Sequence, residues 1–157
     1  GYTQIAFVLV GGGKEKLTLQ KIVTEKKLNN VFFIAPIPKV EIQAMLNRFD
    51  ACYIGLTKDP LFRFGVSPNK LFDYLYSAKP IIYGIESGDY KPVEEAQAGI
   101  QIPAKDPDKL VDAVLSLYKM PVLEREVMGS NGRKVATEQY QYEHLAEKLA
   151  GVIFKHE

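Results

Sequence analysis

Short apolar segments alternate with amphipathic ones along most of the chain. The apolar segments resemble strands that are buried on both faces of a parallel sheet, and they lie at residues 5–10, 31–34, 51–55, 80–85 and 100–102. The segments between them carry apolar residues three or four positions apart and predict helices at about 14–27, 40–49, 67–78, 91–98 and 107–118. Two further helices are predicted at about 121–139 and 142–154. Strand and helix in alternation predict an α/β fold with a doubly wound parallel sheet.

The segment 64–83, FGVSPNKLFDYLYSAKPIIY, is the most informative one for function. Ser67 is a preferred N-cap residue and Pro68 suits the first helical position, so a helix is predicted to begin there. Lys70 then occupies the third helical position, where a carboxylate would be the stabilising choice. A phosphate shared by the helix N–H groups and this ammonium would satisfy the local electrostatics. The helix start therefore predicts an anion site at the carboxyl edge of the sheet.

Helical spacing divides the same segment into two faces. Lys70, Asp73 and Ser77 are predicted to form a polar face, and the adjacent apolar stripe consists of Leu71, Leu75 and Ala78. A simpler interpretation makes Lys70 a solvated surface charge that pairs with Asp73 three residues on.

Other motifs are weaker. Gly11, Gly12 and Gly13 follow a predicted strand, but the third glycine of a dinucleotide fingerprint would fall at Lys16, and any tight strand-to-helix turn favours glycine. The sequence has no phosphate-binding P-loop motif. Asp106 begins a formal D-x-D pattern, but it is accounted for as the N-cap of the helix that follows.

Composition narrows the class of protein. The 157 residues are 46% hydrophobic and 25% charged, which suits one domain with one core, and the net charge of +1 argues against nucleic acid as a partner. No apolar run approaches the roughly 20 residues of a transmembrane helix. The single cysteine, Cys52, lies in an apolar strand and is predicted to be a buried thiol in a reducing compartment, so we expect a cytoplasmic protein.

Taken in order, several segments resemble the C-terminal half of a family 4 glycosyltransferase, particularly bacterial enzymes that build capsule, O-antigen and other surface polysaccharides. These segments are VLVGGG, NNVFFIAPI, ACYIGL, SPNKLFDYLYSAKPII, EEAQAGIQIP, DPDKLVDAV and MGSNGRKVATEQYQY. The resemblance implies a GT-B enzyme with two Rossmann-like domains, of which the C-terminal one holds a nucleotide sugar. It also implies a retaining reaction with no metal and no other cofactor.

The resemblance assigns roles to particular residues. In the E-x7-E pattern of the family, the second carboxylate receives the ribose hydroxyls and falls at Asp73, while the first falls at Gly65, so the pattern is broken here. The diphosphate would be held by Ser67, Pro68, Asn69 and Lys70, with Lys70 as the catalytic cation. The remaining substrate-binding candidates are Ile34 and Ile37 beside the base, and Gly12 and Gly13 facing the phosphates.

The resemblance also implies a domain organisation. Residues 1–140 would form the nucleotide-sugar-binding domain, and residues 141–157 a helix that crosses to an N-terminal domain. We expect a fragment that lacks the first strand and helix, with a UDP-sugar as donor and a glycan or lipid-linked acceptor bound through the absent domain. Peripheral membrane contact is compatible with the full-length enzyme. The alternatives are a nucleotide-sugar epimerase of the same architecture and a non-catalytic Rossmann-like binding or interaction module.

Overall fold

The chain divides into two compact units, Gly1–Ile42 (unit 1) and Gln43–Glu157 (unit 2). The computed structural model describes residues 2–154, and each unit is considered by itself. The predicted domains, 1–140 and 141–157, include residues at both chain ends that lie outside the described ones. Their boundary at residue 140 stays a prediction.

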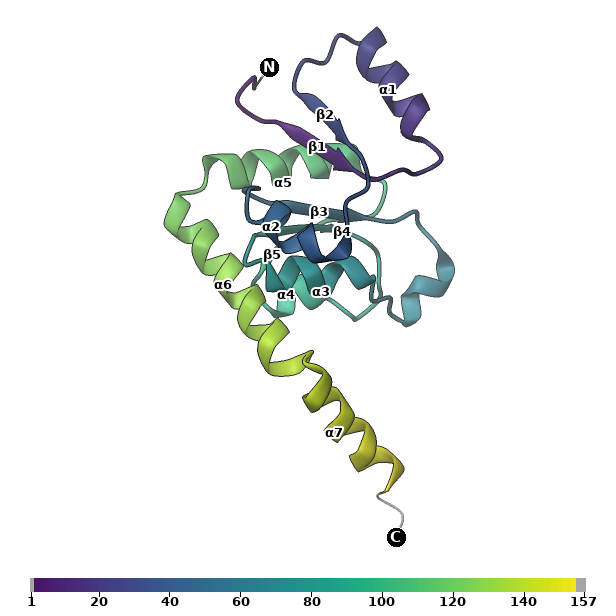
Figure 1. Ribbon diagram of the computed structural model, residues 1–157, viewed down its shortest axis with the longest axis vertical. Helices are drawn as coiled ribbons and strands as arrows, with labels where there is room; N and C mark the ends of the chain where they lie inside the picture. The colour runs from purple at the N-terminus through teal and green to yellow at the C-terminus, as the bar shows by residue number, and fades with distance from the viewer. Residues whose placement is uncertain (1, 155–157) are drawn as a thin grey trace. The chain divides into compact units, whose positions relative to one another are not determined.

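Unit 1 contains a parallel pair of strands and one full helix (Figure 1). Strand β1 (Phe7–Val10) pairs with β2 (Val31–Ile34), and helix α1 (Lys16–Glu25) connects them. A 3-10 helix, η1 (Lys39–Glu41), follows, and α2 (Ile42–Leu46) begins at the last residue of the unit. The parallel pairing and the strand–helix–strand order agree with the prediction.

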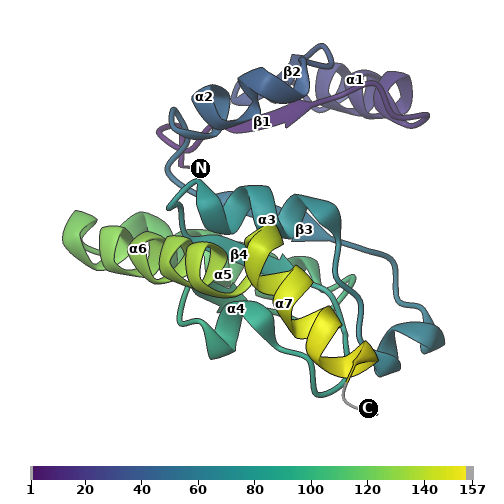
Figure 2. The same cartoon turned by 60° about the horizontal axis from the view of Figure 1, so that its bottom comes forward.

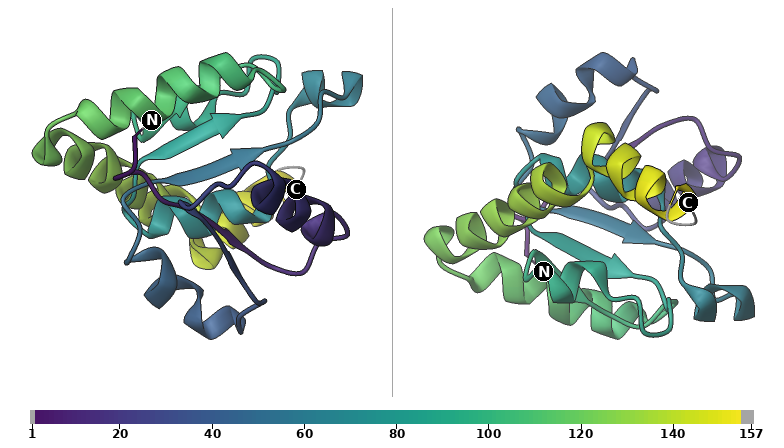
Figure 3. Two further views of the ribbon diagram at one scale, coloured as in Figure 1. Left: turned by 90° about the horizontal axis from the view of Figure 1, so that it is seen from above. Right: turned by 90° about the horizontal axis from the view of Figure 1, so that it is seen from below.

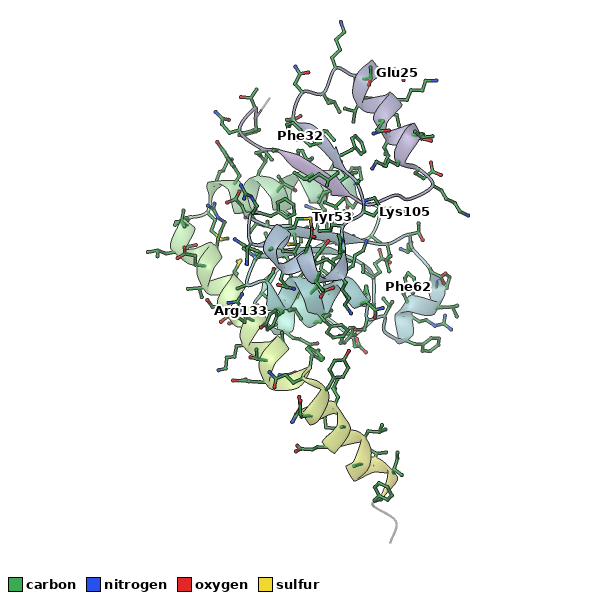
Figure 4. The ribbon with its side chains drawn as sticks, in the orientation of Figure 1. Glu25, Phe32, Tyr53, Phe62, Lys105 and Arg133 are labelled. Atoms are coloured by element: carbon green, nitrogen blue, oxygen red, sulfur yellow. The ribbon has the colours of Figure 1, made fainter. Side chains whose placement is uncertain are left out.

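The apolar side chains of unit 1 are only partly covered. Phe7 in β1 is 42% exposed and Phe32 in β2 is 51% exposed (Figure 4), and no residue of α1 is buried. The prediction that residues 5–10 form a strand buried on both faces is therefore wrong. Two strands and one helix supply too few side chains to cover both faces of a sheet.

Unit 2 is built on a three-stranded parallel sheet in the order β3–β4–β5. The strands are β3 (Cys52–Gly55), β4 (Ile81–Gly84) and β5 (Gly99–Gln101). The other elements of the unit are η2 (Pro60–Phe64), α3 (Asn69–Tyr76), α4 (Pro92–Glu95), α5 (Pro107–Lys119), α6 (Val122–Gln139) and α7 (Tyr142–Ile153). Helix α5 covers one face of the sheet and α3 the other, so the unit has three layers (Figure 3).

Strand β4 shows how the layers are held together. Tyr83 points into the core beneath α3 and is fully buried, whereas Ile82 points into the core beneath α5. Every residue of β4 is buried, as a central parallel strand should be. The apolar segment 80–85 is thus confirmed as a strand buried on both faces.

Helix α6 approaches α3 closely through its glycines. A Cβ atom on Gly129 would lie 2.0 Å from the carbonyl oxygen of Ala78, so no larger residue fits there without a shift of the backbone. Arg133, also on α6, donates a 2.8 Å hydrogen bond from Nε to the carbonyl oxygen of Tyr76 at the end of α3 (Figure 4). A cation at this end is favourable for the helix dipole.

Several element ends differ from the predicted ones. The predicted helix at 40–49 is a 3-10 turn followed by a short α-helix, and that at 91–98 is the four-residue α4. Residues 56–66, which lie between a predicted strand and a predicted helix, contain η2. The N-cap role of Asp106 is confirmed, since its Oδ1 accepts a 2.9 Å hydrogen bond from the Lys109 N–H. The chain changes direction at Tyr140 and Gln141, between α6 and α7 (Figure 2).

Candidate functional site

Helix α3 begins one residue later than predicted. Pro68 is its N-cap residue, with ψ of 135°, and Asn69 is its first helical residue, so Ser67 lies outside the helix. The predictions of Ser67 as N-cap and Pro68 as first helical residue are therefore wrong. No side chain caps this end, which leaves the first N–H groups of the helix for another acceptor. Lys70 is exposed in the first turn, at the second helical position.

The two faces of α3 are confirmed only in part. Leu71 and Leu75 are fully buried, as the apolar stripe predicts. Ser77, predicted on the polar face, is 1% exposed instead, and its hydroxyl donates a 2.7 Å hydrogen bond to the carbonyl oxygen of Tyr74. Ser77 is the C-cap residue and still has helical backbone angles, with φ of −66° and its N–H bonded to the Asp73 carbonyl oxygen. Its burial is therefore a result of tertiary packing at this end of α3, where α6 approaches Ala78.

The loop before α3 is held by contacts that the sequence does not reveal. Tyr83 donates a 3.2 Å hydrogen bond from its hydroxyl to the carbonyl oxygen of Val66, which fixes the chain just before the helix start. Burial raises the pKa of Tyr83, so the donor remains protonated. Gly65 has φ of 97° and ψ of 146°, a backbone conformation that only glycine adopts readily.

Asp73 lines a pocket of about 560 Å³ within unit 2. Phe72 and Tyr140 form one wall, with their rings edge to face at 4.8 Å between centroids. Burial, followed by a hydrogen bond to Tyr90, raises the pKa of Tyr140 to about 12, so its hydroxyl stays neutral near neutral pH. Gln43 donates a 3.0 Å hydrogen bond from Nε2 to the backbone carbonyl of Asp73. The carboxylate is thus half-buried beside aromatic rings.

The remaining candidates lie in unit 1, where the structure brings two predicted loops together. Lys16 donates from Nζ to the carbonyl oxygens of Gly11, at 2.9 Å, and Ile34, at 3.2 Å. A Cβ atom on Gly12 would lie 3.3 Å from Cγ of Pro36, in the segment between Ile34 and Ile37. Lys16 therefore links the glycine turn to the predicted base-binding segment, a role that sequence reasoning missed.

The candidates form two sets, one in each unit. Unit 1 contributes Gly12, Gly13, Ile34 and Ile37, and unit 2 contributes residues 67–70 with Asp73. The uncapped start of α3 with Lys70 can stabilise an anion, and a half-buried carboxylate can accept hydrogen bonds from hydroxyl groups. Within residues 2–154, no group of three metal-ligating side chains is placed to hold a metal ion. None of the described helices is long and apolar enough to cross a membrane.

Comparison with known proteins gives the family and the fold. Residues 2–135 match the model of the family described as "Glycosyl transferases group 1". No curated protein sequence matches the chain. Among solved structures, a sucrose-phosphate synthase from Thermosynechococcus elongatus superposes with a TM-score of 0.79 at 19% identity, covering 98% of this chain and 39% of that one.

Two further solved structures are similar to this chain. HepE of Anabaena, solved in complex with UDP-glucose, has a TM-score of 0.77 at 16% identity and covers 96% of this chain and 42% of its own. A mutant of TarM from S. aureus, solved with Fondaparinux, alpha-GlcNAc-glycerol and UDP, has a TM-score of 0.75 at 22% identity. The match covers 95% of this chain and 29% of TarM. The chain thus spans less than half the length of each.

Proposed function

Because the chain belongs to the glycosyl transferases group 1 family, we propose that it binds the nucleotide-sugar donor of a glycosyltransferase. The observation that carries this proposal is the family match over residues 2–135, which includes every candidate residue. In the proposed site, the start of α3 and Lys70 hold the diphosphate, and Asp73 accepts hydrogen bonds from the ribose hydroxyls. Considered by itself, unit 1 is proposed to contact a base through Ile34 and Ile37 and a phosphate through Gly12 and Gly13.

The chemistry of glycosyl transfer suits such a site. Cleavage of the sugar–phosphate bond develops negative charge on the departing diphosphate, and N–H groups already aimed at that charge stabilise the transition state. Lys70 adds a full positive charge at the same end of α3, which makes it the proposed catalytic residue. With these groups the chain stabilises the leaving group without a metal ion.

The proposal extends to a UDP-sugar as donor, supported by the structural similarity to HepE, which was solved with UDP-glucose. It further includes retention of configuration, a glycan or lipid-linked acceptor, and a role in polysaccharide or glycoconjugate synthesis. Helix α7 exposes Leu149, Val152 and Ile153, an apolar surface suited to the proposed crossing onto an N-terminal domain.

The test is a thermal-shift comparison of UDP, GDP and ADP on this chain. A ligand at a hundredfold over its dissociation constant adds about 2.7 kcal/mol of stability, which raises the midpoint by several degrees for a domain of this size. We expect a rise with UDP that is reduced by Asp73→Ala and by Lys70→Ala.

Matched controls are Glu126→Ala and Lys134→Ala, which remove an exposed carboxylate and an exposed ammonium from α6. These variants should keep the full UDP response. A UDP response that Asp73→Ala and Lys70→Ala leave unchanged would contradict the site and favour a non-catalytic module. The absence of a response to any of the three nucleotides would contradict donor binding by this chain.

A further inference from the structure

The segment 65–68 leads into helix α3 and is tied to the sheet of unit 2 at one point. Tyr83 donates a 3.2 Å hydrogen bond from its hydroxyl to the carbonyl oxygen of Val66. Among residues 2–154, this is the one hydrogen bond that joins the segment to the sheet, since its other bonds each link residues three positions apart. The position of the segment therefore depends on Tyr83.

Tyr83 has little freedom to move. It lies in β4, the central strand, whose backbone pairs with β3 on one side and with β5 on the other. Its side chain has no exposed surface and packs in the same core cluster as Leu71 and Leu75 of α3. The hydroxyl is therefore a donor at a fixed position, and the carbonyl of Val66 points toward it.

The direction of the Val66 carbonyl determines the direction of the next N–H group. No peptide bond among residues 2–154 is cis, and the carbonyl and N–H of a planar trans peptide point in opposite directions. Because the carbonyl of Val66 points into the core toward Tyr83, the N–H of Ser67 points away from the core. Without the Tyr83 hydroxyl, no hydrogen bond within the described chain would hold this carbonyl in place.

Three N–H groups at the start of α3 have no acceptor within the part of the chain that the structure describes. They belong to Ser67, Asn69 and Lys70, and Pro68 between them has no N–H. The first N–H groups of a helix need an acceptor from outside the helix, and together with the helix dipole they favour an anion. The site proposed for the diphosphate therefore consists largely of backbone groups, whose directions depend on how the chain enters α3.

We propose that Tyr83 is a positioning residue for the phosphate groups of the ligand. Its hydroxyl fixes the peptide group between Val66 and Ser67, so that the Ser67 N–H joins the first two N–H groups of α3 in binding an anion. Tyr83 does not touch the ligand, because its side chain is fully buried. The inference rests on the proposed donor function and extends it to a residue of the central strand.

The experiment compares two variants that each remove one buried hydroxyl group. Tyr83→Phe keeps the aromatic ring in the core and removes the hydrogen bond to Val66. The matched control is Ser77→Ala at the other end of α3, because the Ser77 hydroxyl is also buried and also donates to a backbone carbonyl, that of Tyr74. Both variants should lower the unfolding temperature by a few degrees, the usual effect of one lost hydrogen bond.

Ligand affinity separates the two variants. NMR titrations measure the dissociation constants of UDP, inorganic pyrophosphate and uridine. Tyr83→Phe should weaken the binding of UDP and pyrophosphate about tenfold, the effect of one weakened hydrogen bond to a charged group. Uridine has no phosphate, so its affinity should be unchanged, and Ser77→Ala should leave all three affinities unchanged. In the ligand-free protein, the amide signal of Ser67 should shift in Tyr83→Phe and stay in place in Ser77→Ala.

Other results would overturn the proposal. Unchanged UDP and pyrophosphate affinities in Tyr83→Phe would show that the hydroxyl has only a structural role. Equal losses of affinity in Tyr83→Phe and Ser77→Ala would show a general loss of order in unit 2. If pyrophosphate binds and responds to Tyr83→Phe, but UDP binds no more tightly than pyrophosphate, the role of Tyr83 is retained and the proposed donor function is overturned. A wild-type chain that binds neither UDP nor pyrophosphate would overturn both.

Discussion

The strands of the two units have similar sequences but different surroundings. IAFVLV in unit 1 and IIYGI in unit 2 are both apolar runs, yet Phe7 and Leu9 of β1 are exposed, whereas every residue of β4 is buried. In unit 2 the sheet has a helix layer on each face and a strand on each side of β4. In unit 1 each strand pairs with one other strand, and the unit contains a single full helix, α1.

An apolar run therefore predicts a strand more reliably than it predicts burial. The number of layers around a strand determines burial, and that number depends on elements far away in the sequence. The free energy of folding should consequently be concentrated in unit 2, since it scales with the apolar area removed from water. The following experiments test this contrast, in order of decreasing effect.

The largest difference in the free energy of unfolding is expected between two leucines that both lie within helices, one in each unit. Leu75→Ala in α3 removes a side chain with no exposed surface and should lower the free energy of unfolding by about 2–5 kcal/mol. Leu17→Ala in α1 removes a side chain that is 78% exposed and should change it by less than about 0.5 kcal/mol. Urea unfolding measures both, and equal losses would refute the contrast.

Two glycines, one in each unit, provide the second test of the difference in packing. Gly129→Ala places a methyl group 2.0 Å from the Ala78 carbonyl oxygen and should destabilise unit 2 by roughly 3 kcal/mol, the upper end for overpacking. Gly13→Ala in unit 1 meets no atom within 4 Å, so its effect on the unfolding temperature should be small. A stable Gly129→Ala protein would show that α6 is free to move away from α3.

The buried thiol of unit 2 predicts a pH dependence. Burial raises the pKa of Cys52 from 9.0 to about 11, so the folded protein holds this proton more tightly than the unfolded chain does. The resulting stability is complete below pH 9 and is lost as the pH rises toward 11, on the order of 2 kcal/mol in all. Urea unfolding between pH 8 and pH 11 should show a steeper decline in the wild type than in Cys52→Ala.

The pKa of Tyr140 is also raised, but this residue is present in both proteins and cancels in that comparison. Parallel declines in the two proteins would show that Cys52 ionises as an exposed thiol does. A second readout is the reaction of the thiol with a disulfide reagent, which should be slow until the protein unfolds.

The smallest change in stability is expected for a substitution in unit 1. Lys16→Met removes two hydrogen bonds to loop carbonyls and should weaken the unit by about 1 kcal/mol. Hydrogen exchange at the amides of Gly11 and residues 31–34 should become faster. Lys14→Met, a control at an exposed lysine two residues away, should leave these amides unchanged. Unchanged exchange in Lys16→Met would show that the two loops are held in place by other contacts.

Much of the fold could be predicted from the sequence because apolar runs and helix-capping residues indicate the same order of strands and helices. Each of the five apolar runs overlaps a strand, and Asp106 caps α5 as its position before Pro107 predicts. Start and end points were less accurate because they depend on tertiary contacts. Ser77, for example, keeps helical backbone angles as the C-cap of α3, yet tertiary packing at that end buries its side chain.

The candidate site was predictable only where one segment contains the signal. The position of Lys70 in the first turn of α3 could be derived from residues 67–70 alone, and the anion preference of this helix start stays a prediction. The links from Lys16 to Ile34 and from Tyr83 to Val66 could not, since each joins residues that are 17 or 18 positions apart through backbone carbonyls. A carbonyl acceptor is present at every residue, so it leaves no trace in the sequence.

The backbone conformation of Gly65 limits which residues can replace it. Its φ of 97° means that a carboxylate introduced by Gly65→Glu would add strain of about 1–3 kcal/mol before forming any contact. A library that varies residue 65 alone should therefore yield mostly members that are less stable than the Gly65 protein.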